Sequence, residues 1–259
     1  MKKKKIEKIL NKKNGQPIIC LTAYSKAIAQ IADKYCDIIL VGDSLGMVLY
    51  GTKSTKEVTI DTMIRHAKTV KKFTKKSLVV FDMPYKTYDN KSDAYKNARH
   101  VIKLTKCDAV KLEGGKENAN IIKHLVKKGI PVMGHIGLLP QTTTNYKPKG
   151  KNRSEIKNIL DDAVAISKAG VFSIVLECVV EDLAQVITKS VDVPTIGIGS
   201  SKYCDGQILV TNDMLGLSDF FPKFVKRYSN LKKIIDSSIK EYANDVKLRK
   251  FPSKKNVYN

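Results

Sequence analysis

Short apolar runs recur along the chain, and five of them end in an acidic residue or a histidine. The runs are rich in β-branched residues and do not alternate between apolar and polar positions, so they predict strands that are buried on both faces. Such strands are typical of a parallel sheet covered by helices. The runs span residues 38–43, 78–82, 109–113, 131–135 and 173–177, and their last residues are Asp43, Asp82, Glu113, His135 and Glu177.

Segments with apolar residues at helical spacing separate these runs. They predict helices over residues 26–36, 92–102 (capped by Ser92), 117–128, 154–169 and 182–190. Further strands are predicted at residues 17–22, 195–199 and 206–211. Eight strands that alternate with helices in 259 residues predict an α/β fold, and the length suits one barrel better than two smaller domains. We expect a single (β/α)8 TIM barrel domain over residues 1–259, with an N-terminal helix and a C-terminal helical tail.

The polar residue that closes each run lies at the carboxyl end of its predicted strand. In a closed barrel all the carboxyl ends lie on one rim, where the connecting loops build the active site. Four carboxylates and one imidazole should therefore converge there. Because so much negative charge is costly without a counter-charge, the pattern predicts that a cation is held at this rim.

Asp43 and Asp82 are hard oxygen ligands that suit Mg²⁺, which usually binds one or two carboxylates and leaves its other positions to water and substrate. Strand-end aspartates can instead cap the following helix or turn. The presence of Glu113 favours the metal site, in which Glu113 would hold a metal-bound water. Cysteines and histidines do not group at ligand spacing, which disfavours zinc.

Lys111 and Glu113 lie two residues apart on one predicted strand, so both side chains should point into the barrel. Lys111 could neutralise the acids, bind an anionic substrate or form a Schiff base, and the nearby carboxylates favour a protonated, substrate-binding lysine. His135 could ligate, donate to a substrate oxygen or pack, and we expect it to bind substrate. Glu177 projects from an apolar neighbourhood, which favours a general base, with strand-end capping as the alternative.

The composition is strongly basic, with 47 Lys and Arg against 25 Asp and Glu, a net charge of +22 and a pI near 9.7. Such a charge raises the question of nucleic-acid binding. Lysines are spread along almost all predicted helices and loops, while arginine and aromatic residues are scarce, which indicates a bias of the whole sequence. We therefore expect no nucleic-acid partner, and the field favours an anionic small-molecule substrate.

The five cysteines are an odd number without a CxxC pair, and most of them neighbour apolar segments. They predict reduced thiols in a cytoplasmic protein. The lysine-rich residues 1–13 contain no apolar core long enough for a signal peptide. No segment is predicted to span a membrane.

Seven motifs resemble those of the ketopantoate hydroxymethyltransferase family, in the same order. They are VGDSLG (residues 41–46), DMPY (82–85), VKLEGG (110–115), GHIGLLPQ (134–141), LEC (176–178), GIG (197–199) and DGQILV (205–210). The match runs from about Ile18 to Phe224, most of the chain. The resemblance implies a (β/α)8 barrel, usually a homodecamer, that works in pantothenate biosynthesis.

The resemblance also implies a reaction and a role for each matching residue. A one-carbon unit would pass from the co-substrate 5,10-methylenetetrahydrofolate to 3-methyl-2-oxobutanoate, giving 2-dehydropantoate. By position, Asp43 and Asp82 match the Mg²⁺ ligands, and Glu113 matches the acid associated with that metal. Asp43 and Asp82 would also belong to the substrate-binding site, because the substrate binds at this metal. Ser44 and Lys111 match substrate contacts, and Glu177 matches the proton acceptor.

Three segments depart from the family pattern. Residues 145–150 read NYKPKG where the family usually has a segment ending near Tyr-Lys-Val-Gln-Gly, and residues 199–201 read GSS where Gly-Ala-Gly is common. These rim segments are expected to affect folate access, and thus affinity or rate, before reaction type. Lys56 and Glu57 replace a usually apolar Leu-Pro pair, and the polar, basic residues 142–153 are the best candidate for a mobile loop.

Two rival functions remain open from the sequence. A Mg²⁺-dependent oxoacid enzyme of the phosphoenolpyruvate mutase and isocitrate lyase type would share the barrel and the enolate chemistry, but the chain lacks a Lys-Lys-Cys-Gly-His pattern. A degenerate barrel that binds RNA would explain the charge of +22. It predicts salt-sensitive nucleic-acid binding and no metal-dependent proton exchange, whereas the intact acids predict the reverse.

Overall fold

The computed structural model describes residues 2–143, 146–219 and 221–258. The chain divides into two compact units, Met1–Val210 and Thr211–Asn259, which are described separately. The expectation of a single domain over residues 1–259 stays a prediction.

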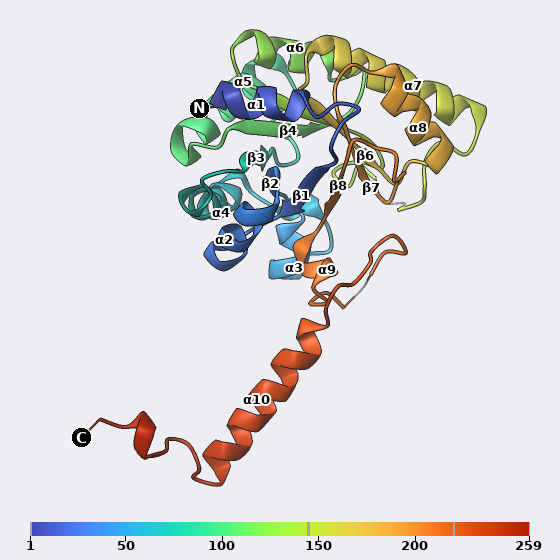
Figure 1. Cartoon of the computed structure of the whole chain (residues 1–259). Coiled ribbons are helices and arrows are strands. Elements are labelled where there is room, and N and C mark those ends of the chain that lie inside the picture. Colours follow the sequence, from blue (N-terminus) through green and yellow to red (C-terminus); the bar gives the residue numbers. More distant parts are fainter. Residues whose placement is uncertain (1, 144–145, 220, 259) are drawn as a thin grey trace. The chain divides into compact units, whose positions relative to one another are not determined.

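The first unit is a closed barrel of eight parallel strands, as predicted (Figure 1). Each strand pairs with the next in the sequence, and the first pairs with the last, so the barrel has no open edge. The strands are β1 (Ile18–Thr22), β2 (Ile38–Val41), β3 (Leu78–Asp82), β4 (Ala109–Glu113), β5 (Val132–Gly137), β6 (Ser173–Glu177), β7 (Thr195–Ile198) and β8 (Gly206–Leu209).

Helices connect the strands and cover the outside of the barrel (Figure 1). They are α2 (Lys26–Tyr35), α3 (Leu45–Tyr50), α4 (Ile60–Phe73), α5 (Lys91–Thr105), α6 (Ala119–Lys127), α7 (Arg153–Ala169) and α8 (Glu181–Ser190), with a 3-10 turn at Thr55–Glu57. The helix α4 is absent from the predicted set. Its buried stripe of Met63, Ile64, Ala67 and Val70 has helical spacing. The stripe contains only these four residues and lies among lysines and threonines, so its signal in the sequence is weak.

Three predicted boundaries need correction. The cap of α5 is Asn90 and not Ser92, because the Asn90 Oδ1 atom accepts a hydrogen bond from the backbone N–H of Asp93 at 2.9 Å. Strand β5 continues to Gly137, so His135 lies inside the strand and not at its end. Strand β8 stops at Leu209, and Thr211 begins the short helix α9 (Thr211–Met214) of the second unit.

The helix α1 (Lys2–Leu10) closes the barrel at the amino ends of its strands. Its Ile9 is 1% exposed and packs with the residues that fill the barrel interior, among them Ile18, Ile38 and Leu78. Beyond the helix, the Lys12 Nζ atom lies 2.6 Å from Asp37, and that of Lys13 lies 2.9 Å from Asp205. The interior is therefore a packed core, and the opposite rim is left for chemistry.

The side chain of Asp33 on α2 fixes the turn that leads into β3. Its carboxylate accepts hydrogen bonds from the backbone N–H groups of Lys75, Lys76 and Ser77 at 2.9, 2.9 and 2.7 Å. Burial alone would raise the pKa of Asp33, but these donors lower it below its ordinary value of 3.8. A lowered pKa in the folded state means that this stabilisation is present at neutral pH and is lost as the pH falls below the ordinary value.

We expect Asp33→Asn to reduce the free energy of unfolding by about 1 kcal/mol near neutral pH, because the amide replaces one of the accepting oxygens with a donor and the site is partly exposed. The difference from the parent protein should shrink as the pH falls below the ordinary value of 3.8, because the parent carboxyl is then protonated first in the unfolded chain and, at lower pH, in the folded protein. Urea denaturation of both proteins across this range measures it. A difference that stays constant with pH would show that the charge of Asp33 does not matter.

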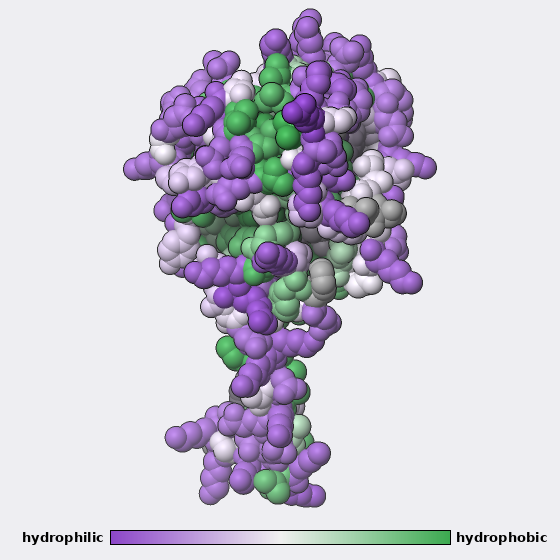
Figure 2. All heavy atoms as spheres, turned by 90° about the vertical axis from the view of Figure 1, so that its right-hand side faces the viewer, coloured by the Kyte–Doolittle hydropathy of each residue, from purple (hydrophilic) through white to green (hydrophobic). Residues whose placement is uncertain are grey.

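The second unit contains α9, the long helix α10 (Leu231–Lys247) and a final 3-10 turn, Lys254–Asn256, so a C-terminal helical tail is present as predicted. No described residue of α10 is buried, although the helix carries a row of apolar side chains that includes Ile234, Ile235, Ile239 and Tyr242. Figure 2 shows such apolar atoms between the hydrophilic ones of this unit, while hydrophilic side chains cover most of the visible barrel surface. No helix among the described residues has the length and apolar character needed to cross a lipid bilayer.

Candidate functional site

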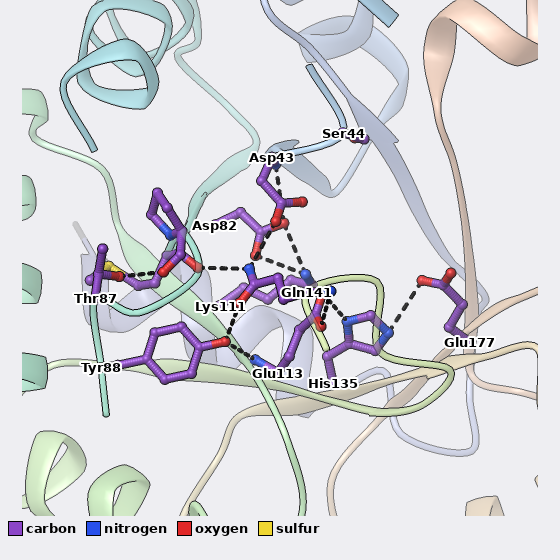
Figure 3. Close-up of polar contacts among 12 residues, drawn as sticks. Asp43, Ser44, Asp82, Thr87, Tyr88, Lys111, Glu113, His135, Gln141 and Glu177 are labelled. Carbon is purple, nitrogen blue, oxygen red and sulfur yellow. Dashed lines mark hydrogen bonds and ion pairs between the residues drawn. The ribbon is translucent and has the colours of Figure 1, made fainter. Parts of the chain in front are cut away.

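The strand register brings the predicted site residues together at the carboxyl-end rim of the barrel. Across neighbouring strands, Asp82 is paired with Lys111, Glu113 with His135, and Gly137 with Glu177. Figure 3 shows their side chains pointing towards one another. We call the following six residues the rim cluster: Asp43, Asp82, Lys111, Glu113, His135 and Glu177.

Lys111 and Asp82 form a buried ion pair at the centre of the rim cluster. The Lys111 Nζ atom lies 2.8 and 2.9 Å from the two carboxylate oxygens of Asp82. Burial alone would lower the pKa of Lys111, but the carboxylates of Asp82, Glu113 and Asp43 raise it above its ordinary value. The lysine is therefore a permanent cation and a poor nucleophile, which disfavours a Schiff base.

Asp43 follows the end of β2 and is 5% exposed. Its backbone N–H points towards an Asp82 carboxylate oxygen at 3.4 Å. Burial raises the pKa of Asp43 well above its ordinary value, and the Asp82 carboxylate raises it further. Burial likewise raises the pKa of Asp82, against the influence of Lys111. Two buried acids thus repel each other at the place where the sequence predicts a cation.

His135 lies between two glutamates on neighbouring strands (Figure 3). Its Nδ1 atom is 3.5 Å from Glu113 Oε1, and its Nε2 atom is 3.2 Å from Glu177 Oε2. Burial and Lys111 would lower the pKa of His135, but the two glutamates outweigh them and raise it to about 9. Burial would raise the pKa of Glu113, but His135 lowers it below its ordinary value. His135 is therefore an imidazolium that joins the two acids.

The Glu177 side chain is 17% exposed, whereas those of Glu113 and His135 are 3% and 2% exposed. Glu177 is thus the acid of this triad that a bound molecule reaches most readily. Ser44 is the N-cap residue of α3, and its hydroxyl is 2.8 Å from the hydroxyl of the buried Tyr24. The predicted substrate contact of Ser44 stays a prediction, as does that of His135.

Gln141 and Tyr88 also belong to the site, although neither was expected there. The Gln141 side chain donates to an Asp43 carboxylate oxygen at 2.8 Å and accepts a hydrogen bond from the Tyr88 hydroxyl. The Gln141 backbone N–H donates to Glu113 at 3.0 Å. The only sequence signal for Gln141 is its place at the end of the GHIGLLPQ motif. Tyr88 lies in a loop between β3 and α5, where periodicity carries no information.

The backbone around Glu177 depends on two unusual conformations. Cys178 has a φ of +51°, a left-handed conformation that costs a non-glycine residue energy. Gly137 on the neighbouring strand has a φ of +95°, and a Cβ atom there would lie 2.4 Å from the Glu177 carbonyl oxygen. That carbonyl accepts the backbone N–H of Leu138 at 2.8 Å. Glycine at position 137 therefore lets the two strand ends approach each other.

We expect Gly137→Ala to lower the free energy of unfolding by about 2–4 kcal/mol, because left-handed strain and overpacking add together. Turnover should also fall, since the new methyl group displaces the backbone of Glu177. Gly129→Ala is the matched control, because Gly129 has a φ of +77° and a Cβ atom there would meet no other atom within 4 Å. It should cost only about 1–2 kcal/mol and leave turnover intact. Equal losses in both variants, measured by urea denaturation and a turnover assay, would exclude the close approach at Gly137.

The segments that depart from the family pattern lie around the same rim. Residue 145 lies outside the described residues. Lys149 exchanges backbone hydrogen bonds with Cys178 and Val180, so this end of the predicted mobile loop is attached beside Glu177. The Ser200 hydroxyl donates to the Val179 carbonyl at 2.9 Å. Both segments therefore border the Glu177 side of the rim cluster. Elsewhere, the Lys56 Nζ atom lies 5.6 Å from the centre of the Tyr85 ring.

The charges of the rim cluster suit a divalent cation. When its four carboxylates are ionised, Lys111 and the imidazolium of His135 leave an excess of two negative charges. Within the described parts of the chain, no three acidic, histidine or cysteine side chains form a group that could enclose a metal ion. Mg²⁺ does not need such a group, because one or two carboxylates together with water and substrate suffice. The oxygen donors of Asp43 and Asp82 fit that requirement.

Comparison with known proteins identifies close relatives. The sequence profile of the ketopantoate hydroxymethyltransferase family matches residues 3–254. The 3-methyl-2-oxobutanoate hydroxymethyltransferase of Pelagibacter ubique is 57% identical over 255 residues, which cover 98% of this chain and 99% of the relative. Proteins of the same name from Rhizobium etli and Maricaulis maris are 51% and 47% identical, over 93% and 95% of this chain and 90% of each relative.

Similar solved structures share the barrel at much lower sequence identity. The 2,3-dimethylmalate lyase of the PEP mutase/isocitrate lyase superfamily has a TM-score of 0.64 at 12% identity, over 99% of this chain and 88% of that protein. A phosphonopyruvate hydrolase solved with oxalate and Mg²⁺ has a TM-score of 0.61 at 13% identity, over 97% of this chain and 93% of that protein. These similarities show the fold alone.

Proposed function

Because the chain belongs to the ketopantoate hydroxymethyltransferase family, we propose that it transfers a one-carbon unit to 3-methyl-2-oxobutanoate, giving 2-dehydropantoate for pantothenate biosynthesis. The donor would be 5,10-methylenetetrahydrofolate. The observation that carries the proposal is the rim cluster, which combines a place for a divalent cation, a buried cationic lysine and a more exposed carboxylate. The substrate is an anion with an acidic hydrogen beside its keto group, and it needs all three.

Asp43 and Asp82 would hold Mg²⁺. Glu113 would lie close by, because Gln141 donates hydrogen bonds to both Glu113 and Asp43. Lys111 donates to Asp82. When bound, Mg²⁺ would act as a Lewis acid that polarises the keto group and stabilises negative charge on the enolate oxygen.

The cationic groups of the site would bind and orient the oxoacid. Lys111 is held protonated by the surrounding carboxylates and would attract the substrate carboxylate. The net charge of +22 also favours the approach of an anion, although it does so for the whole protein and not only for the rim cluster. Ser44, which is fixed by its bond to Tyr24, would supply a further hydrogen bond.

Glu177 would accept the proton from C3 of the oxoacid. The His135 imidazolium contacts the Oε2 atom of Glu177 and so fixes the direction of this carboxylate. The Glu177 side chain is more exposed than that of His135, and it would face the bound substrate. The carbon nucleophile formed by this step would then attack the one-carbon unit, with one water supplying the hydroxyl group of the product and tetrahydrofolate leaving. The neighbouring segments that end near Lys149 and Ser200 would form the side from which the folate approaches.

We also propose a homo-oligomer, a decamer by resemblance to the family. The apolar row of α10, which is exposed within its own unit, supports an association that would cover it. A cytoplasmic location stays a prediction.

The proposal is tested by incubating the purified protein with the oxoacid, 5,10-methylenetetrahydrofolate and Mg²⁺ and measuring 2-dehydropantoate by mass spectrometry. We expect product that depends on all three components. Cleavage of a 2-hydroxydiacid without formation of this product would instead favour the mutase and lyase type. Salt-sensitive RNA binding without product would favour the degenerate barrel.

A further inference from the structure

Gln141 lies in the loop after β5 and is 1% exposed, yet it has no place in the proposed reaction steps. Its side-chain Nε2 atom donates to Asp43 Oδ2 at 2.8 Å and to the Met83 carbonyl at 2.9 Å. Its backbone N–H donates to Glu113 Oε2 at 3.0 Å. One buried residue therefore touches the chain at the ends of β2, β3 and β4, as Figure 3 shows for the acids.

The hydrogen-bond network permits only one orientation of the Gln141 amide. The carboxylate of Asp43 and the carbonyl of Met83 only accept hydrogen bonds, so the NH₂ group must face them and both of its hydrogens are used. The Tyr88 hydroxyl accepts the backbone N–H of Glu113 at 3.3 Å, and its own hydrogen is directed to Gln141 Oε1. Tyr88 thus holds the amide from the opposite side.

We propose that Gln141, held by Tyr88, is a positioning residue that aligns the Asp43 and Glu113 carboxylates and so sets the affinity of the rim cluster for its divalent cation. This inference rests on the proposed function, since it assumes that Asp43 helps to hold Mg²⁺. When a residue that orients a metal-binding carboxylate is removed, the affinity for the metal typically falls strongly.

A neutral amide suits this task better than a charged group. Lysine or arginine at this position would orient the carboxylates but would neutralise the charge that attracts the cation. The amide orients the Asp43 carboxylate and leaves the excess of negative charge intact. Lys111 instead neutralises Asp82, so the two aspartates are held by different kinds of partner.

The experiment measures binding of Mn²⁺, a spectroscopic substitute for Mg²⁺ at oxygen ligands, to the full-length metal-free protein by electron paramagnetic resonance, with competition by Mg²⁺. Gln141→Met keeps the length of the side chain and removes its amide. We expect this variant to bind Mn²⁺ about 10- to 100-fold more weakly. Tyr88→Phe, which removes one hydroxyl, should weaken binding roughly 2- to 10-fold. Turnover in both should recover partly at saturating metal.

The matched control is Gln207→Met, because Gln207 is an exposed glutamine of β8 whose amide donates only to the Ser201 carbonyl among the contacts described. Its affinity for Mn²⁺ should stay within about twofold of the parent value. If Gln141 had a purely structural role, Gln141→Met would lower the melting temperature of the metal-free protein, but the folded variant would keep the parent dissociation constant for Mn²⁺. That result would overturn the inference.

Every other outcome of the Mn²⁺ binding experiment also supports or overturns the role of Gln141. If Gln141→Met does not fold, the milder Tyr88→Phe provides the test, and unchanged metal binding in that variant overturns the inference. If the parent protein binds neither Mn²⁺ nor Mg²⁺, the metal site in the proposed function fails and the inference fails with it. Normal binding by the parent and by both variants contradicts the inference alone.

Discussion

Replacing Glu177 with glutamine should reduce kcat by roughly 10²- to 10⁴-fold, the loss expected when a general base is removed. Glutamine has the shape of glutamate and can still meet the His135 Nε2 atom, which lies 3.2 Å away, so the fold should be retained. The Mg²⁺ affinity should also change little, because among the contacts described His135 is the only other member of the rim cluster that the Glu177 side chain meets. Steady-state kinetics with saturating oxoacid and folate measures the loss.

Glu181→Gln is the control for this variant. It is the same chemical change four residues further along, on an exposed position in the first turn of α8. Its kcat should stay within about twofold of the parent value, since its side chain is exposed and makes none of the described contacts with the rim cluster. If Glu177→Gln turned over like the Glu181 variant, another group would have to accept the proton.

Replacing Lys111 with methionine should lower the free energy of unfolding of the metal-free protein by about 3–5 kcal/mol. The ammonium group contacts both oxygens of Asp82, and the two side chains are 5% and 2% exposed. Without it, the Asp82 carboxylate stays buried beside Asp43 with no cation in direct contact. Turnover should also fall steeply, because the proposed contact to the substrate carboxylate is lost. Urea denaturation in the presence of EDTA measures the stability.

A second substitution separates these two effects. Adding Asp82→Asn to Lys111→Met removes the uncompensated charge, so most of the stability should return while turnover stays low. Lys103→Met on the exposed side of α5 is the control and should change the stability by less than about 0.5 kcal/mol. A Lys111→Met protein as stable as this control would show that Asp82 does not depend on the lysine.

The barrel and its rim acids are predictable from the sequence because strands buried on both faces leave a simple signal. Each run of apolar residues marks a strand, and its last polar residue marks the rim, so Asp82, Glu113 and Glu177 are found at their observed positions. The register then determines which side chains meet. Periodicity does not reveal that register, and it places His135 at the end of its run when the strand in fact continues to Gly137.

The contacts that refine the site are not predictable in the same way. Gln141 and Tyr88 lie in loops, where side-chain direction depends on the folded backbone and not on a repeat. The bond between Ser44 and Tyr24 joins the segments after β1 and β2, which no local pattern relates. Helix α4 shows the other limit, because a narrow apolar stripe among lysines leaves a weak signal.

Metal-assisted enolisation is measured most directly by proton NMR of 3-methyl-2-oxobutanoate in D₂O with the protein and Mg²⁺ but without folate. We expect the C3 hydrogen to exchange for deuterium, and we expect this exchange to disappear with EDTA and in Glu177→Gln. If no exchange occurs, the experiment is repeated with the folate present, so that a base assembled only in the complete site is also detected. Absence of exchange under both conditions, or exchange that persists in Glu177→Gln, would contradict metal-assisted enolisation with Glu177 as the base.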